Sequence, residues 1–113
     1  MNHLLPILVA LVLIAIGTVA LVAPAQAAEM YGVPLTDRSG LAYVRGCGAR
    51  DLALGVLTLA LLEHARTVLL GLSLVAAADF VIVALNHRNQ RPLRSLTIHG
   101  AGAIALLILA GFS

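Results

Sequence analysis

The sequence has no tryptophan, no lysine and only one cysteine, Cys47. A single cysteine excludes an internal disulfide and a metal site built from several cysteines. Charged residues make up only 11% of the chain, whereas the surface of a small soluble domain carries roughly 25–35%. All the positive charge comes from arginine, and the formal net charge is only +2. So small an excess, spread over several loops, argues against a nucleic-acid partner.

Most of the chain is apolar, with 61% of its 113 residues hydrophobic. Four apolar runs are close to the ~20 residues that an α-helix needs to cross a bilayer core of ~30 Å. We predict transmembrane spans at residues 4–23, 44–62, 65–85 and 95–112. The chain is therefore expected to be all-α. It is expected to form one integral membrane domain over residues 1–113, an antiparallel bundle of four transmembrane helices.

The first apolar run has a second interpretation, as a secretory signal, because Ala25-Gln26-Ala27 has the small-x-small form of a cleavage site. However, the run is longer than the usual ~7–15-residue signal core, and no basic residue precedes it. We therefore expect a retained span. Pro24 should end it, since proline cannot continue the helical hydrogen-bond ladder. A short interfacial helix at residues 25–30 and a polar loop at residues 37–40 should follow.

The arginines predict the orientation of the bundle. One face of the membrane receives the loops at residues 24–43 and 86–94. This face holds Arg38, Arg45, Arg88, Arg91 and Arg94, with Arg50 just inside it. The other face receives only Arg66. The positive-inside rule therefore places these two loops in the cytoplasm and both termini outside, in the cell (inner) membrane. Cys47 is then expected at the cytoplasmic boundary.

The predicted topology brings ionisable residues to a similar depth. Asp51 and Asp79 lie about six to eight residues inside their spans, or ~10 Å at 1.5 Å per residue. His99 enters from the same side of the membrane. Ionisable side chains inside a bilayer are expensive and usually have a partner or a function. We treat Asp51, Asp79 and His99 as candidate catalytic residues that meet in one layer.

The second span supplies four candidate ligand-binding residues, Arg45, Arg50, Gly48 and Gly55. Arg50 can turn inward beside Asp51 or reach outward on its long stem. Gly48, Gly55 and Thr58 recur at helical spacing on the same face as Asp51, and small residues let transmembrane backbones approach closely. A structural interpretation stays open, in which Asp51 pairs with an arginine and His99 lies near the headgroups.

The sequence contains no phosphate-binding loop, no nucleophile elbow and no metal motif, so we predict neither a metal nor a cofactor. Gly46-Cys47-Gly48 lacks the rest of a nucleotide-binding fingerprint. Close helix packing explains this glycine pair better.

Two stretches carry a resemblance to a known family. The first stretch contains Gly17, Pro24 and Tyr31-Gly32-Val33-Pro34. The second stretch is Arg45-Gly46-x-Gly48-x-Arg50-Asp51-Leu52-Ala53-Leu54-Gly55. This order resembles small four-helix membrane proteins of an uncharacterised domain family, similar in layout to DoxX-like proteins. The resemblance covers nearly the whole chain. It implies a four-helix bundle that keeps its first helix, and it brings no established activity.

Two classes of function stay open, and the sequence does not decide whether the protein is an enzyme. In the first class, the polar layer binds a small apolar molecule such as a quinone, an isoprenoid or a sterol-like compound. Its acid–base groups would support an isomerisation or a cyclisation. In the second class, the protein is a non-catalytic assembly or accessory subunit. Its small-residue faces would pack against a second copy or a membrane partner. The lipid bilayer is a partner in both.

Overall fold

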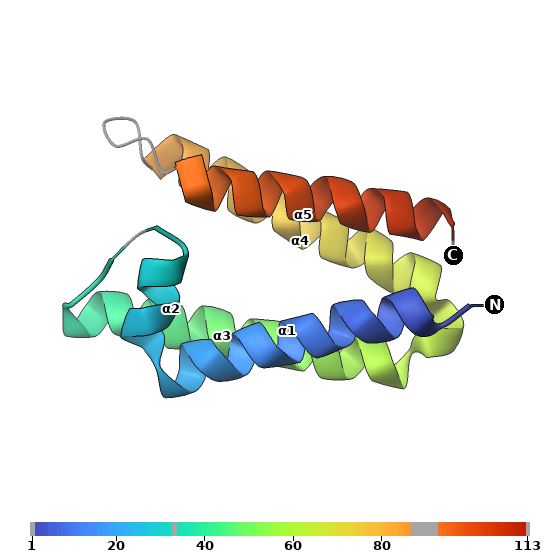
Figure 1. Cartoon of the computed structure of the whole chain (residues 1–113), viewed down its shortest axis with the longest axis horizontal. Coiled ribbons are helices and arrows are strands. Elements are labelled where there is room, and N and C mark those ends of the chain that lie inside the picture. Colours follow the sequence, from blue (N-terminus) through green and yellow to red (C-terminus); the bar gives the residue numbers. More distant parts are fainter. Residues whose placement is uncertain (1, 33, 87–92, 113) are drawn as a thin grey trace. The chain divides into compact units, whose positions relative to one another are not determined.

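The computed structural model of the protein describes residues 2–32, 34–86 and 93–112. These residues form five α-helices and a short 3-10 turn, with no strand among them (Figure 1). The prediction of an all-α chain is confirmed for this part of the molecule. Most of the loop predicted at residues 86–94, with Arg88 and Arg91, lies outside the described residues.

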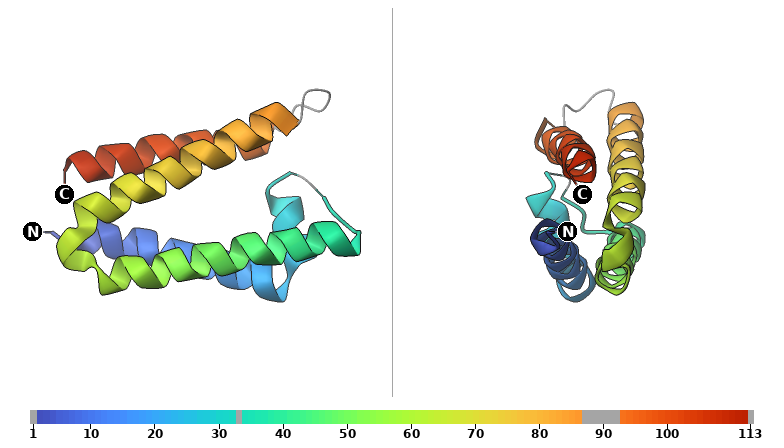
Figure 2. Two further views of the ribbon diagram at one scale, coloured as in Figure 1. Left: turned by 180° about the vertical axis from the view of Figure 1, so that it is seen from behind. Right: turned by 90° about the vertical axis from the view of Figure 1, so that its right-hand side faces the viewer.

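The helices belong to two compact units, Asn2–Glu63 and the chain from His64 onward. Helices α1, α2 and α3 make up the first unit, and α4 and α5 make up the second (Figure 2). Each unit is described by itself. The single domain over residues 1–113 stays a prediction.

Helix α1 (Leu4–Val22) is apolar along its whole length. Its start is stabilised by Asn2, whose Oδ1 accepts a hydrogen bond of 3.1 Å from the backbone N–H of Leu4. Helix α2 (Pro24–Met30) follows after one residue. Pro24 stands at its first position, where the missing N–H has no helical partner to lose. The sequence prediction of a helix end before Pro24 and a short helix after it is confirmed.

Helix α3 (Arg38–Ala60) begins earlier than the sequence suggested. Asp37 is its N-cap, and its Oδ2 accepts a 2.7 Å hydrogen bond from the backbone N–H of Gly40. The polar loop predicted at residues 37–40 is therefore wrong, because these polar residues start a helix whose first N–H groups need an acceptor. As a result, Arg45, Arg50 and Asp51 lie well inside α3.

Helices α1 and α3 run antiparallel with their backbones in close contact. A Cβ atom on Gly17 would lie 2.6 Å from the carbonyl oxygen of Gly48. A Cβ atom on Gly55 would lie 2.8 Å from the carbonyl oxygen of Ala10. Both pairs of small residues are spaced by seven positions, so each helix presents them on one face. Small residues at these positions are what allow the two backbones to approach so closely.

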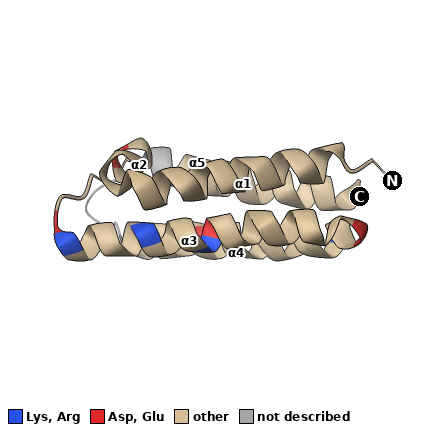
Figure 3. Ribbon diagram, turned by 90° about the horizontal axis from the view of Figure 1, so that it is seen from below, with Lys and Arg blue, Asp and Glu red and all other residues tan. Residues whose placement is uncertain are grey.

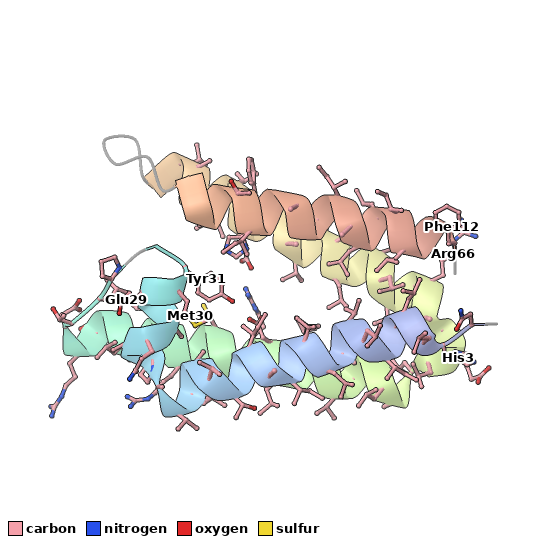
Figure 4. The ribbon with its side chains drawn as sticks, viewed as in Figure 1. His3, Glu29, Met30, Tyr31, Arg66 and Phe112 are labelled. Atoms are coloured by element: carbon pink, nitrogen blue, oxygen red, sulfur yellow. The ribbon has the colours of Figure 1, made fainter. Side chains whose placement is uncertain are left out.

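The second unit is a helical hairpin of α4 (Ala65–Asn86) and α5 (Leu93–Gly111), preceded by the 3-10 turn Leu62–His64. Arg66 near the start of α4 and Phe112 after the end of α5 lie at the same end of the hairpin (Figure 4). The two helices are therefore antiparallel. Their bounds are close to those predicted for the third and fourth spans.

By length and composition, two helices are apolar enough to cross a membrane, Leu4–Val22 and Leu62–Leu85. The described apolar part of α5, Thr97–Gly111, is shorter, and α3 carries Arg45, Arg50 and Asp51 along its length. Large apolar side chains are nevertheless exposed on every long helix, among them Leu11, Val56, Leu74 and Ile104.

Candidate functional site

Asp79 and His99 face each other across the α4–α5 hairpin. Asp79 lies in the second half of α4 and His99 near the start of α5, so the antiparallel arrangement brings them to one level. The Nδ1 atom of His99 lies 4.0 Å from Oδ2 of Asp79. This separation is longer than a hydrogen bond, and it becomes an ion pair only when the imidazole is protonated. The predicted meeting of these two residues is present in the structure.

The pair is largely enclosed, with about one fifth of each side chain exposed: 19% for Asp79 and 21% for His99. Beside it, a Cβ atom on Gly100 would lie 3.3 Å from the ring of Phe80. The aromatic ring therefore packs directly on the backbone of α5 at Gly100, the residue after His99. The flanking residues on α4 are three alanines, Ala76, Ala77 and Ala78. Small apolar residues therefore precede Asp79 along α4.

Arg50 and Asp51 form a second polar pair, on α3. The Nε and Nη2 atoms of Arg50 lie 3.1 Å and 3.0 Å from the same oxygen, Oδ1 of Asp51. The two residues lie about midway along α3, where Figure 3 shows a basic and an acidic segment side by side. The contacts of Gly48 with Gly17, and of Gly55 with Ala10, place Asp51 opposite the middle of α1. One part of the structural interpretation, Asp51 paired with a neighbouring arginine, is present.

Arg45 of α3 lies near the C-terminal end of α1. Its Nε donates to the carbonyl oxygen of Leu21 at 3.4 Å, one of the last carbonyls of α1 that have no partner within the helix. A positive charge is also favourable at a helix C-terminus. Arg45 therefore caps α1 from α3, a role that the sequence prediction of a ligand-binding residue did not include.

Gly48 and Gly55, also predicted to bind ligand, are buried against α1. The backbone of α1 occupies the space beside both glycines, so their role in the structure is close packing. Sequence reasoning missed their partners Ala10 and Gly17. The signal was present, because these two residues show the same seven-residue spacing as the glycines of α3.

Arg50 and Asp51 belong to the first unit, whereas Asp79 and His99 belong to the second. The meeting of all four in one layer stays a prediction. Another contact joins His3 and Glu63, whose Nε2 and Oε1 atoms are 3.8 Å apart. Within residues 2–32, 34–86 and 93–112, no group of three His, Cys, Asp or Glu side chains is placed to hold a metal ion.

The model of a protein family described as a domain of unknown function, DUF4267, matches residues 10–113. The chain belongs to this family. The DUF4267 match includes α1 from residue 10 onward, the other four helices, the Arg50–Asp51 pair and the Asp79–His99 pair. No curated protein and no solved structure matches the chain. The predicted membership of an uncharacterised family is confirmed, and the likeness in layout to DoxX-like proteins stays a resemblance.

Proposed function

We propose that this DUF4267 chain is an integral membrane protein whose helices α1, α3, α4 and α5 cross the bilayer as an antiparallel bundle. The exposure of the apolar helices supports this. Only 22% of the most apolar stretch within Leu4–Val22, and 17% of that within Leu62–Leu85, is buried within the protein. Core helices of soluble proteins bury most of their apolar residues, so these helices need an apolar environment outside the chain.

The packing of α1 supports a retained first span. Gly48 and Gly55 of α3 are buried against Gly17, Ala10 and Ile14 of α1. Removal of α1 as a signal peptide would expose this small-residue face and leave the Leu21–Arg45 contact unmade. We propose that α1 stays as part of the bundle.

The orientation has a direct test in Cys47, which is exposed on α3. With both termini outside and the arginine-rich loops in the cytoplasm, Cys47 lies near the cytoplasmic boundary. A membrane-impermeant maleimide should label it in inverted vesicles or lysed cells and not in intact cells. Efficient labelling of intact cells would reverse the proposed orientation.

Within the membrane, we propose that the Asp79–His99 pair binds a small apolar molecule and exchanges a proton with it. The observation that carries this proposal is a carboxylate and an imidazole 4.0 Å apart on facing helices. Ionisable groups are costly in a bilayer and are usually retained for function. Imidazole and carboxylate are also the commonest general acid–base groups, and an isomerisation or cyclisation by proton transfer needs no cofactor.

Copurification tests this proposal. The protein is purified in mild detergent, and the apolar molecules that it carries are extracted and identified by mass spectrometry. The wild type should carry one compound well above its share of the membrane lipid, and Asp79→Leu should lose it. Glu63→Gln, which removes an exposed carboxylate, should retain it. Equal lipid profiles for all three proteins would contradict the binding site.

A non-catalytic accessory subunit is the second candidate. The glycine face of α3 is already used by α1, so a partner would pack elsewhere. A Cβ atom on Gly71 or Gly102 would meet nothing within 4 Å, which leaves α4 and α5 with surfaces suited to close helix packing. A stable larger complex in native mass spectrometry, lost on Gly71→Leu or Gly102→Leu, would favour this candidate.

A further inference from the structure

We infer that Arg38 and Arg45 of α3 bind the headgroup of an anionic phospholipid at the proposed cytoplasmic end of the first unit. This inference rests on the proposed function, because it needs α1 and α3 to cross a bilayer. Both arginines are exposed. Figure 3 shows two basic segments between the start of α3 and its Arg50–Asp51 pair.

Arg45 lies at the level where the apolar helix α1 ends. Its Nε donates to the carbonyl oxygen of Leu21, one residue before the end of α1 at Val22. The end of an apolar transmembrane helix marks the boundary between hydrocarbon and headgroups. Tyr43, two residues before Arg45, is 78% exposed and suits this level, where amphipathic rings collect. Arg45 is therefore placed at the inner edge of the headgroup layer.

Arg38 is placed at the outer edge of that layer. It is the first residue of α3, seven residues before Arg45, and this separation corresponds to ~10 Å along the helix at 1.5 Å per residue. Seven residues are close to two helical turns, so both side chains project from one face of α3. The headgroup layer is about 5–8 Å deep on each side of a bilayer. The two guanidinium groups thus span its depth.

The charge of both arginines is unbalanced within the described part of the chain. Among residues 2–32, 34–86 and 93–112, neither guanidinium forms an ion pair. Asp37, next to Arg38, is engaged as the N-cap of α3. The contact with Leu21 uses only the Nε of Arg45, and the two Nη groups keep their donors for a further acceptor. Both side chains are therefore available to an anionic partner.

Phosphate suits this pair because guanidinium forks bind its oxygens two at a time. We assign the phosphate to a lipid and not to a soluble ester, because apolar surface adjoins the arginines. Val22, next to the residue that Arg45 contacts, is 79% exposed, and Val19 on the preceding turn of α1 is 41% exposed. An acyl chain can lie along these valines while the phosphate contacts the arginines. A soluble phosphate ester has no apolar part to place there.

Native mass spectrometry of the full chain in a non-ionic detergent tests the inference. Phosphatidylglycerol and phosphatidylcholine with identical acyl chains are added in equal amounts, and the ratio of the two bound lipids is measured. The wild type should prefer phosphatidylglycerol by about 25-fold, because choline neutralises the other headgroup and each interfacial arginine favours an anionic lipid about fivefold. The preference should fall as the salt concentration rises.

Variants connect the preference to the two side chains. Arg38→Gln and Arg45→Gln should each lower it about fivefold, and the double variant should remove it. Arg38 makes no side-chain hydrogen bond within the described residues, so Arg38→Gln tests the site even if loss of the Leu21 contact unfolds Arg45→Gln. Arg45→Lys keeps the charge and should retain most of the preference. The matched control Arg66→Gln removes an exposed arginine at the start of α4 and should bind as the wild type does.

Equal binding of the two lipids by the wild type, or a preference that survives in the double variant, would overturn the inference. A loss of the same size in Arg66→Gln would assign the preference to net charge, with the same consequence. Displacement of phosphatidylglycerol by glycerol phosphate would make this a site for soluble phosphate esters and overturn the lipid assignment.

Alkaline carbonate extraction of membranes separates this inference from the proposed function. A chain that resists extraction and shows no lipid preference would contradict the headgroup site alone. A chain that carbonate releases would contradict the bundle of transmembrane helices on which the headgroup site depends.

Discussion

The antiparallel pair α1 and α3 (the first hairpin) and the antiparallel pair α4 and α5 (the second hairpin) are held together in different ways. In the first unit, glycines let the backbone of α1 touch the backbone of α3, and a Cβ atom on Gly17 would lie 2.5 Å from the backbone nitrogen of Leu52. In the second unit, the ring of Phe80 covers Gly100, and a polar pair lies between the helices with a separation of 4.0 Å. Backbone contact fills the space between α1 and α3, whereas α4 and α5 meet through side chains, two of them ionisable. This comparison assigns a structural role to the first hairpin and a candidate site to the second.

The strongest test of the comparison is Gly17→Leu. All three of the nearest atoms to a Cβ at this position are backbone atoms of Gly48 and Leu52, which cannot rotate away as a side chain can. The helices must separate, and we expect a loss of about 3 kcal/mol in unfolding free energy, at the upper end of overpacking. The melting temperature in one detergent measures it.

Gly46→Leu is the matched control, since a Cβ at Gly46 meets nothing within 4 Å. This variant should be neutral or up to ~1 kcal/mol more stable, because glycine is a poor helix former. Similar melting temperatures for the two leucine variants would mean that α1 and α3 do not pack backbone to backbone.

The next largest expected effect is the difference in stability between the variants Asp51→Asn and Asp79→Asn. Asp51→Asn removes the negative charge that two nitrogens of Arg50 contact. Since 38% of the Arg50 side chain is exposed, we expect a loss of about 1–2 kcal/mol, below the ~3–5 kcal/mol typical of fully buried pairs.

Asp79→Asn should change the stability by no more than ~0.5 kcal/mol, or should raise it, because a carboxylate kept for function is held at a cost in stability. Both aspartate variants are compared by thermal unfolding in the same detergent. A marked loss for Asp79→Asn would make Asp79 a structural residue like Asp51, and the contrast between the hairpins would disappear.

The smallest expected effect concerns the ring contact. In Gly100→Ala the new methyl group would lie 3.3 Å from two ring atoms of Phe80, so the ring must move by a few tenths of an ångström. We expect the variant to gain ~0.5 kcal/mol less in stability than Gly102→Ala, whose Cβ has open space and receives the full benefit of alanine in a helix. A loss as large as that of Gly17→Leu would show that α4 and α5 are as rigidly packed as α1 and α3.

Local sequence signals predicted much of the fold. The apolar runs and Pro24 gave the bounds of α1, α2, α4 and α5 to within a few residues. The start of α3 was missed because Asp37-Arg38-Ser39-Gly40 has the composition of a loop. Its capping function depends on one side-chain hydrogen bond to Gly40. A polar residue before an apolar run is evidence for a helix start as much as for a loop.

The candidate site was predictable only in part. Helix ends set the depth of Asp79 and His99, and an antiparallel hairpin brings equal depths together, so their meeting followed from the topology. The role of Arg45 did not follow from the topology, because it depends on where the last carbonyls of α1 lie relative to α3. The packing partners of Gly48 on α1 did not follow from the topology either. Helix α1 is apolar on all sides, so its hydrophobic pattern does not mark which face α3 covers.

The division of contacts between the hairpins has a consequence for biosynthesis. The packing partners of Gly17, Gly48 and Gly55 all lie between Ala10 and Gly55. The first hairpin therefore has its glycine contacts available once the chain has been synthesised to Glu63, before α4 has emerged from the ribosome. Domains and hairpins generally fold as units in the order of synthesis. The nascent protein would then place a rigid pair of helices first, and the pair that carries Asp79 and His99 would assemble second.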